Sequence, residues 1–219
     1  MVQIQKSREA YYHPKLSKRM MTEKQTIMKK LFLLLALIPV FVNAQKFELT
    51  INGFVDSENP EKDYIVIPFE GKSQKEIYDL ALSAVGKSFI SPKERVSNVE
   101  YSQININGII PNVTYISRLG LKLYFDLYYN LIFEFKDGRM KINGLDINKI
   151  VRVDPVGAEQ FICLSQNQIR NGLVYDDKFI FYKNGRLCSK KYKEHVETAV
   201  NELVFSFVNL MNKDNNSDW

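Results

Sequence analysis

A β-hairpin signal near the middle of the chain constrains the fold more than any other feature. The stretch 124–135 is rich in aromatic and β-branched residues, Asp137-Gly138 follows it, and residues 140–145 return toward it. Asp-Gly between two such runs is typical of a two-residue type I′ turn. The sequence therefore predicts two antiparallel strands in the centre of the fold.

The turn also fixes which residues of the two strands face each other. It pairs Phe135 with Met140, Phe133 with Ile142, and Glu134 with Lys141. The first two pairs are apolar and lie on one face, whereas the charged pair lies on the other face. We therefore expect one face of the hairpin to be buried and the other to contact water.

Two amphipathic helices are available to cover the apolar face. Ser73 opens the first helix, and Glu76 three residues later completes a capping box. Its apolar stripe contains Ile77, Leu80, Ala81, Ala84 and Val85. Gly86 is expected to end this helix in the left-handed conformation.

The second helix is predicted over residues 189–212, near the end of the chain. Its apolar stripe contains Tyr192, Val196, Ala199, Val200, Leu203, Phe207 and Met211. Both helices have a single apolar face, so we expect both to pack on the same side of the sheet. The predicted class is α+β, with an antiparallel sheet and two amphipathic helices on one face.

Further strands are predicted where β-prone residues alternate or run together between turn signals. These segments are 46–55, 63–68, 98–107, 113–117 and 179–182, the last followed by an Asn184-Gly185 turn. The segment 158–170 is ambiguous, and one interpretation is a helix ended by Asn171-Gly172.

An export signal precedes the predicted domain. Two lysines at positions 29 and 30 are followed by the mostly apolar run 31–42, and Val42 and Ala44 occupy the −3 and −1 positions of a cleavage site. Twelve residues are too few to cross a membrane, which needs about 20. We expect cleavage between Ala44 and Gln45 and a location in the periplasm or outside the cell.

The remaining boundaries follow from these segments. Residues 1–27 are polar and basic, and they represent either an extended leader or a start that lies too early. The expected divisions are 1–27 as leader, 28–44 as signal peptide, 45–62 as an N-terminal strand and linker, 63–150 as the main α+β domain, 151–212 as an extension with the closing helix, and 213–219 as a disordered tail.

Net charge argues against nucleic acid as a partner. The whole chain carries 30 Lys and Arg against 25 Asp and Glu, but residues 1–44 hold eight of the basic and two of the acidic residues. Residues 45–219 therefore contain 22 basic and 23 acidic residues. Nucleic-acid binding depends on a basic surface that neutralises phosphates, and the exported part has no basic excess.

Several of these elements resemble a known family. They are the strand ending in Ile67-Pro68-Phe69, the helix start 71–78 and the hairpin 129–139. Together they resemble domain-of-unknown-function family 4468 over roughly residues 60–150. That family occurs in exported proteins of Bacteroidota and is described as having a fold like the TATA-binding protein. The resemblance implies this fold but no known activity, and the fold name alone does not imply DNA binding.

Candidate catalytic groups are few. Without the leader, the chain has one histidine, His195, which we interpret as a solvated surface residue beside Glu194. Asp176-Asp177 is an acid–base pair in principle, although adjacent carboxylates before a strand more often form a turn. No cofactor or metal site is expected from these residues.

Two cysteines remain, Cys163 and Cys188. Their spacing does not fit a Cys-x-x-Cys redox motif, whereas export permits a disulfide. They are interpreted either as a structural pair or as two buried thiols.

Two functions from different classes remain open. The first is a non-catalytic envelope protein that binds another protein, a glycan or a small apolar ligand through a sheet face or groove. The second is a periplasmic hydrolase with a carboxylate-based site. The single histidine and the lack of catalytic motifs favour the first.

Overall fold

The computed structural model describes residues 45–88, 95–166 and 178–215, which belong to one compact unit. Its strands and helices are β1 (Phe47–Thr50), β2 (Gly53–Asp56), β3 (Tyr64–Pro68), α2 (Gln74–Ser88), β4 (Val96–Val99), β5 (Gln103–Arg118), β6 (Leu121–Lys136), β7 (Arg139–Asn143), β8 (Asp146–Val153), β9 (Glu159–Ser165), β10 (Phe179–Phe181) and α4 (Lys190–Asn215).

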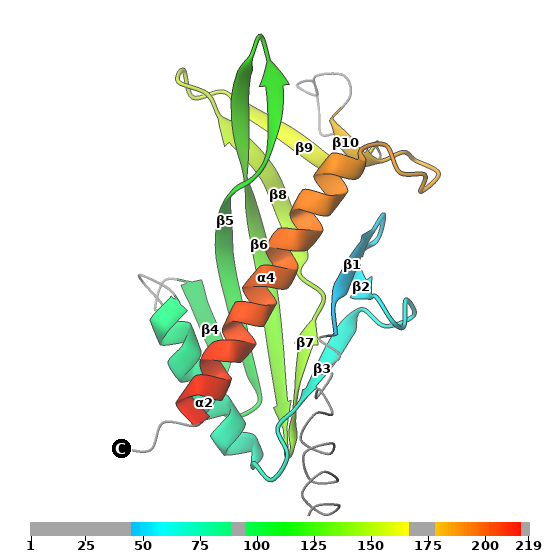
Figure 1. Ribbon diagram of the computed structural model, residues 1–219. Helices are drawn as coiled ribbons and strands as arrows, with labels where there is room; N and C mark the ends of the chain where they lie inside the picture. The colour runs from blue at the N-terminus through cyan, green and yellow to red at the C-terminus, as the bar shows by residue number, and fades with distance from the viewer. Residues whose placement is uncertain (1–44, 89–94, 167–177, 216–219) are drawn as a thin grey trace, which may run out of the picture. The chain divides into compact units, whose positions relative to one another are not determined.

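Eight strands form one sheet around the long strand β6. The order β10-β9-β8-β6-β5-β4 is antiparallel except for the parallel pair β9–β10, and β7 joins β6 to β3. β1 and β2 form a separate antiparallel pair. In Figure 1 the sheet lies behind the two helices. None of the helices in the described part of the chain is both long and apolar enough to cross a membrane.

The central hairpin has the predicted register. Phe133 pairs with Ile142, Phe135 with Met140 and Glu134 with Lys141. The four apolar side chains are at most 3% exposed, whereas Lys141 Nζ lies 3.1 Å from Glu134 Oε1 on the other face. The predicted type I′ turn is wrong. Gly138 has a positive φ of 73°, but Asp137 does not have a positive φ. A type I′ turn needs positive φ at both residues.

The first predicted helix is confirmed as α2, together with its capping box. Glu76 Oε2 accepts the Ser73 N–H at 2.8 Å, and Ser73 Oγ accepts the Glu76 N–H at 3.3 Å. The hydrogen bond that the Ser73 hydroxyl donates to Glu76 Oε2, followed by the one from the Ser73 N–H, lowers the pKa of Glu76. The prediction that Gly86 ends the helix was wrong. Gly86 has no positive φ, and the helix continues to Ser88.

The second predicted helix is confirmed as α4, and both helices pack on the same face of the sheet. Phe207 of α4 stacks on Phe133 with ring centroids 4.5 Å apart. Tyr78 of α2 meets Phe135 edge-on at 5.5 Å. Because Phe133 and Phe135 are two residues apart on β6, they point to the same side of the sheet. The α+β class and the placement of its helices are therefore as predicted.

Helix α4 is longer than expected. It begins after Ser189, whose Oγ accepts the Tyr192 N–H at 3.3 Å, and it runs to Asn215. Residues 213–215, expected in the tail, are therefore helical, and residues 216–219 lie outside the described residues.

Two predicted strands are hairpins instead. Segment 46–55 contains β1 and β2, which are joined by a turn at Ile51-Asn52. Thr50 pairs with Gly53 across this turn, and Gly53 has a φ of 114°. Segment 98–107 spans the end of β4, a three-residue turn and the start of β5. Tyr101 makes this second turn by adopting a φ of 58°. The turn contains no glycine, so it lacked the usual sequence signal.

The helix considered for 158–170 was wrong. Residues Glu159–Ser165 form strand β9, which pairs with β8 on one side and β10 on the other. Residues 167–177, including Asn171-Gly172 and Asp176-Asp177, lie outside the described residues. Strand β3 was predicted correctly, but as an edge strand it has only Ile65 fully buried.

Candidate functional site

The sheet divides into two hairpins at one end. Pairing of β6 with β8 stops at Asp126 and Val151, but β5–β6 pairing continues to Arg118 and Leu121. β8–β9 pairing likewise continues to Val153 and Glu159. We call residues 115–124 and 151–158 the distal end. Figure 1 shows these two hairpins separating at the top, beyond the helices.

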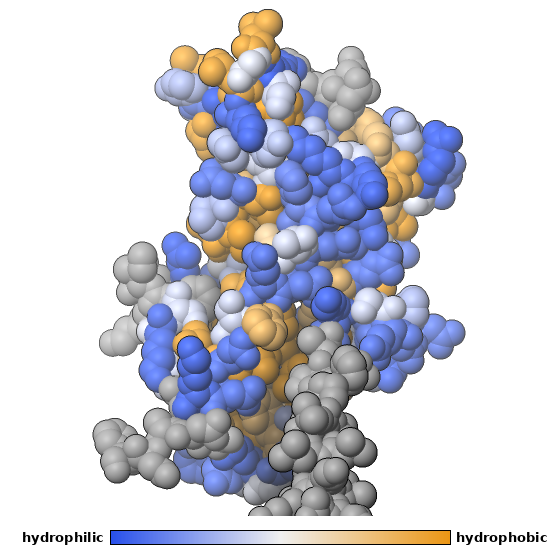
Figure 2. Space-filling view, in the orientation of Figure 1, coloured by the Kyte–Doolittle hydropathy of each residue, from blue (hydrophilic) through white to orange (hydrophobic). Residues whose placement is uncertain are grey.

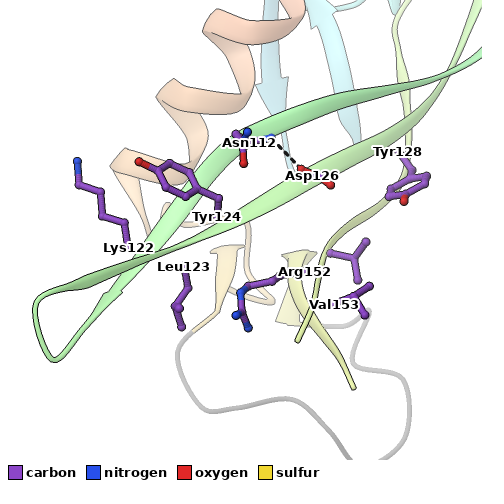
Figure 3. Close-up of a pocket in the computed structure, with 9 residues that line it drawn as sticks. Asn112, Lys122, Leu123, Tyr124, Asp126, Tyr128, Arg152 and Val153 are labelled. Carbon is purple, nitrogen blue, oxygen red and sulfur yellow. Dashed lines mark hydrogen bonds between the residues drawn. The ribbon is translucent and has the colours of Figure 1, made fainter. Parts of the chain in front are cut away.

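A pocket of about 410 Å³ lies in the fork between the two hairpins. Its lining residues are Asn112, Lys122, Leu123, Tyr124, Asp126, Tyr128, Val151, Arg152 and Val153. Figure 3 shows Leu123 and Arg152 on one side of strand β6, with Lys122 and Tyr124 on the other. The lining is thus mixed in charge and polarity.

The single carboxylate of this pocket has a structural partner. Asp126 Oδ1 accepts the backbone N–H of Asn112 at 2.8 Å. Asn112 has a φ of 54° and lies in an irregularity of β5 between Ile110 and Thr114. Asp126 therefore stabilises this bend. A retaining or inverting glycosidase site needs two facing carboxyl groups, and among residues 45–88, 95–166 and 178–215 only Asp126 contributes one to this pocket.

The tip of the β5–β6 hairpin combines exposure with an unfavourable backbone conformation. Leu119 and Gly120 separate the last pair, Arg118 and Leu121, and their φ values are 48° and 79°. Positive φ at both residues indicates a type I′ turn, whose first position favours Asn or Asp. A leucine there costs about 1 kcal/mol. Leu119 is nevertheless fully exposed, and Leu121 is 68% exposed.

Other apolar side chains extend this exposed surface. Val153 and Val156, at the neighbouring β8–β9 turn, are 57% and 88% exposed. Asp154 holds that turn, because its Oδ1 accepts the N–H groups of Val156 and Ala158 at 3.0 and 2.8 Å. Figure 2 shows apolar surface at the top of the molecule, over the tip of β5–β6. Large exposed apolar groups that gather at one end mark interaction sites.

Charge at the tip has one sign. Residues 101–125 contain no Asp or Glu, and their two charged side chains, Arg118 and Lys122, flank the exposed leucines. Both residues are exposed. The tip therefore presents apolar side chains between two cations.

A cation–aromatic cluster joins the hairpin to helix α4. Lys191 Nζ lies 3.3 Å from the centroid of the Tyr115 ring and donates to the Tyr115 carbonyl oxygen at 2.8 Å. Lys122 Nζ lies 4.5 Å from the same ring, and Tyr124 packs beside it with centroids 5.7 Å apart. The contacts of Lys191 hold the base of the hairpin against the helix, whereas those of Lys122 and Tyr124 lie within the hairpin.

His195 belongs to this cluster, so its interpretation as a solvated surface residue was wrong. The side chain is half-buried, and its Nδ1 lies 3.0 Å from Thr114 Oγ1. Its ring centroid is 5.8 Å from that of Tyr115. Because Thr114 is only 1% exposed, the contact joins α4 to the interior of β5. We therefore interpret His195 as a packing residue.

The two cysteines do not form a disulfide in this structure. Both thiols are free and half-buried, and burial raises the pKa of Cys163. The Cys163 N–H donates to the Lys178 carbonyl oxygen at 2.9 Å, and the Cys188 N–H donates to the Ile180 carbonyl oxygen at 2.8 Å.

The remaining candidates give little chemistry. Among the described residues, no group of three or more His, Cys, Asp or Glu side chains is arranged to hold a metal ion. The buried carboxylate in this part of the chain is Asp56, which is 4% exposed and accepts the Glu58 N–H at 2.9 Å. Ala44 lies outside the described residues, so the cleavage site stays a prediction.

The turn between β5 and β6 at the distal end was not predicted from the sequence. A signal was present, because Leu119-Gly120 interrupts a β-prone stretch that extends from Val113 to Phe125. Glycine is common at the second position of a type I′ turn, but leucine is rare at the first. A second sequence feature that distinguishes this hairpin is the absence of acidic residues over 101–125.

Comparison with known proteins confirms the family resemblance. Residues 64–149 match the family described as "Domain of unknown function (DUF4468) with TBP-like fold". No curated protein matches the chain. The family description names a TBP-like fold and no activity, so the match over residues 64–149 supports this fold and assigns no function.

Two crystal structures are similar to this chain. One is a TBP-like protein from Parabacteroides distasonis ATCC 8503, with 14% identity and a TM-score of 0.47, covering 71% of this chain and 92% of that chain. The other is a DUF4468 family protein from Bacteroides ovatus ATCC 8483, with 17% identity and a TM-score of 0.45, covering 68% of this chain and 83% of that chain.

Proposed function

We propose that this protein is a non-catalytic binding domain of the cell envelope and that it contacts its partner through the distal end. The observation that carries the proposal is Leu119, a fully exposed leucine with a φ of 48°. It neither packs in the core nor suits its turn, so folding alone gives no reason for it. An apolar side chain held outward at the end of a rigid hairpin is suited to contact another surface.

The rest of the chain supports this placement. The hairpin that carries Leu119 continues from strands whose other ends form the core, so its orientation is fixed by the fold. Lys191 and His195 further hold its base against α4 through Tyr115 and Thr114. Binding residues on well-supported loops are common because the scaffold fixes their position.

Photo-crosslinking in living cells tests the proposal. A photoreactive amino acid replaces Leu119 in the full chain, expressed in a Bacteroides host, and Phe205 serves as the control position. Phe205 is 59% exposed but lies on α4. We expect position 119 to crosslink to an envelope component and position 205 to give no such product. Equal crosslinking at both positions, or none at position 119, would contradict the proposal.

Export is a separate part of the proposal. It is supported by the lysines at 29 and 30, the apolar run 31–42 and the small residues Val42 and Ala44. N-terminal sequencing of the protein from the envelope fraction is expected to give Gln45 as the first residue. A cytoplasmic protein that retains residues 31–42 would contradict the envelope location.

A further inference from the structure

We infer that strand β4 is a homodimer interface and that it pairs antiparallel with β4 of a second copy of this chain. This surface is separate from the distal end, so the inference goes beyond the proposed function. In Figure 1, β4 forms an edge of the sheet, and β5 pairs with its inner side. Residues 97–100 along this edge are all exposed.

Other strand edges of the molecule are covered. Gln45 Oε1 accepts the Val66 N–H on the edge of β3 at 2.9 Å. The Asn201 side chain accepts the N–H of Phe47 in β1 at 2.8 Å and donates to its carbonyl oxygen at 2.9 Å. The Cys188 N–H donates to a carbonyl oxygen of β10 at 2.8 Å. Proteins cover their edges in this way because an open edge pairs with another strand.

Strand β4 has no such cover among the described residues. Val96–Val99 contains no charged residue, proline or bulge, and no side chain in the described part of the chain bonds to its outer backbone groups. Beyond β4, the edge of β5 is interrupted by Pro111 and by an irregularity between Ile110 and Thr114. An open, uncharged edge is a template for another strand.

The hydrogen-bond pattern identifies the backbone groups of β4 that face outward. Phe135 donates its N–H to the Ser102 carbonyl oxygen at 3.0 Å, so even-numbered residues at this end of β5 bond to β6 and odd-numbered ones to β4. The β4–β5 register pairs odd residues with odd residues. The N–H and C=O groups of Val96 and Asn98 therefore point away from the sheet.

A two-fold axis through Ser97 satisfies all of these groups. Side chains alternate between the two faces of a strand, so a two-fold axis between antiparallel copies passes through a residue that lies opposite its own copy. With Ser97 at that position, Val96 of each copy lies opposite Asn98 of the other. Each outward N–H group then meets an outward C=O group.

Charge complementarity favours a second copy over a foreign strand. Arg95 precedes the strand and Glu100 follows it, and both are exposed. In the register through Ser97, Arg95 lies opposite Val99 of the other copy and beside its Glu100. The antiparallel arrangement therefore brings opposite charges together at both ends of the interface, and the strand is complementary to itself.

An exposed leucine adds apolar surface beside this edge. Asn98 Nδ2 donates to the Tyr78 hydroxyl of α2, which places that flank of the helix over β4. Leu82 follows Tyr78 by one helical turn, shares this flank and is 40% exposed. The two-fold axis is perpendicular to the sheet, so the helices of both copies lie on the same side and Leu82 borders the interface. Because two short strands bury little area, we expect a reversible dimer.

The two distal ends point in opposite directions in this dimer, because the paired strands are antiparallel and β4, β5 and β6 belong to one sheet. Each copy then presents Leu119 and Leu121 at opposite ends of a continuous sheet. A dimer of this form suits a protein that joins two partners. This last step rests on the proposed function, whereas the dimer itself does not.

Sedimentation velocity over a range of concentrations tests the inference with the full chain purified from its expression host. We expect a monomer–dimer equilibrium for the wild type. Val99→Lys places a lysine opposite Arg95 of the other copy and is expected to raise the dissociation constant of the dimer about tenfold. Val99→Glu faces the same arginine with the opposite charge and is expected to keep or lower the dissociation constant.

Val153→Lys provides the matched control, because Val153 is 57% exposed and Val99 is 61% exposed. It changes an exposed valine of β8 and is expected to leave the dissociation constant unchanged. A wild type that stays monomeric would overturn the inference, as would equal dissociation constants for Val99→Lys and Val99→Glu. Either result leaves crosslinking at position 119, and with it the proposed function, untouched.

Ser97→Cys tests the register. The Cα atoms of a non-hydrogen-bonded antiparallel pair are about 4.5 Å apart, which a disulfide allows. Oxidised glutathione is expected to convert the two thiols into a disulfide that links the copies, while the glutathione is reduced. Ser117→Cys, at an exposed position of β5, is the control, and the wild type with Cys163 and Cys188 gives the background.

Two results of this crosslinking would contradict the inference. If Ser97→Cys gives no more covalent dimer than Ser117→Cys, β4 does not lie opposite its own copy. If Ser97→Cys links to a different protein in cells and not to a second copy, the edge of β4 binds a foreign strand and the homodimer is wrong.

Discussion

The two ends of strand β6 carry similar side chains in opposite environments. At one end Phe133 and Phe135 are 0% and 3% exposed beneath α4 and α2. At the other end Leu121 points to the same side of the strand and is 68% exposed. The alternation of the strand is identical at both ends, so the pattern fixes which side a residue faces but not whether anything covers it.

Replacing equivalent apolar residues at the two ends gives the largest expected contrast. Phe133→Ala removes a fully buried ring stacked on Phe207 and is expected to lower the free energy of unfolding by about 3–5 kcal/mol. Leu121→Ala is expected to change it by less than about 0.5 kcal/mol. Denaturant melts measure both, and similar losses would mean that the distal end is part of the core.

Alkaline pH gives the next largest effect, again at a buried position of β6. Tyr129 is 2% exposed, and burial raises its pKa to about 12, while the charge of Arg95 acts in the opposite direction. Above pH 10 the unfolded chain loses this proton and the folded chain keeps it. The free energy of unfolding therefore falls between pH 10 and pH 12, by at most about 2–3 kcal/mol.

Comparison with Tyr129→Phe isolates this contribution, because the other tyrosines titrate in both proteins. The variant is expected to lose less stability between pH 10 and pH 12 than the wild type. Denaturant melts at several pH values provide the measurement. If the two proteins lose stability in parallel, Tyr129 is not held neutral by burial.

A cap substitution on α2 gives a smaller effect. Ser73→Ala removes the hydroxyl that accepts the Glu76 N–H and donates to Glu76 Oε2. It is expected to lower the free energy of unfolding by about 1 kcal/mol, as is usual for an N-cap. Ser117→Ala, at an exposed distal position, is the control and is expected to have almost no effect.

The sequence predicted those parts of the fold in which local chemistry and packing agree. The Asp137-Gly138 turn and the alternation around it determined a register that the structure confirms, and Ser73 with Glu76 located the start of α2. Details of burial were harder to predict. Leu80 and Leu203 of the predicted stripes are only partly buried, whereas Tyr78 and Val204 are fully buried.

Errors arose where a distant strand decides the local structure. Segment 159–165 fits a helix by composition but becomes β9 because β8 and β10 pair with both of its edges, β10 in parallel. Tyr101 and Leu119 make turns with positive φ where no Asn or Gly stands at that position. The turn at the distal end was not predicted because turn prediction relies on residues that suit the turn conformation, and leucine does not suit a positive φ.

Leu119→Asn at the distal end has the smallest expected effect on stability, and the sign of this effect shows directly whether the distal end contributes to the fold. Leu119→Asn replaces a residue that is poorly suited to positive φ with one that is well suited, and it removes no buried contact. It is expected to raise the free energy of unfolding by up to about 1 kcal/mol. Val113→Asn, which changes a buried residue of the same strand, is the contrast and is expected to be destabilising. A thermal melt measures both. If Leu119→Asn lowers the melting temperature, then Leu119 supports the fold, and its exposed position needs no binding partner to explain it.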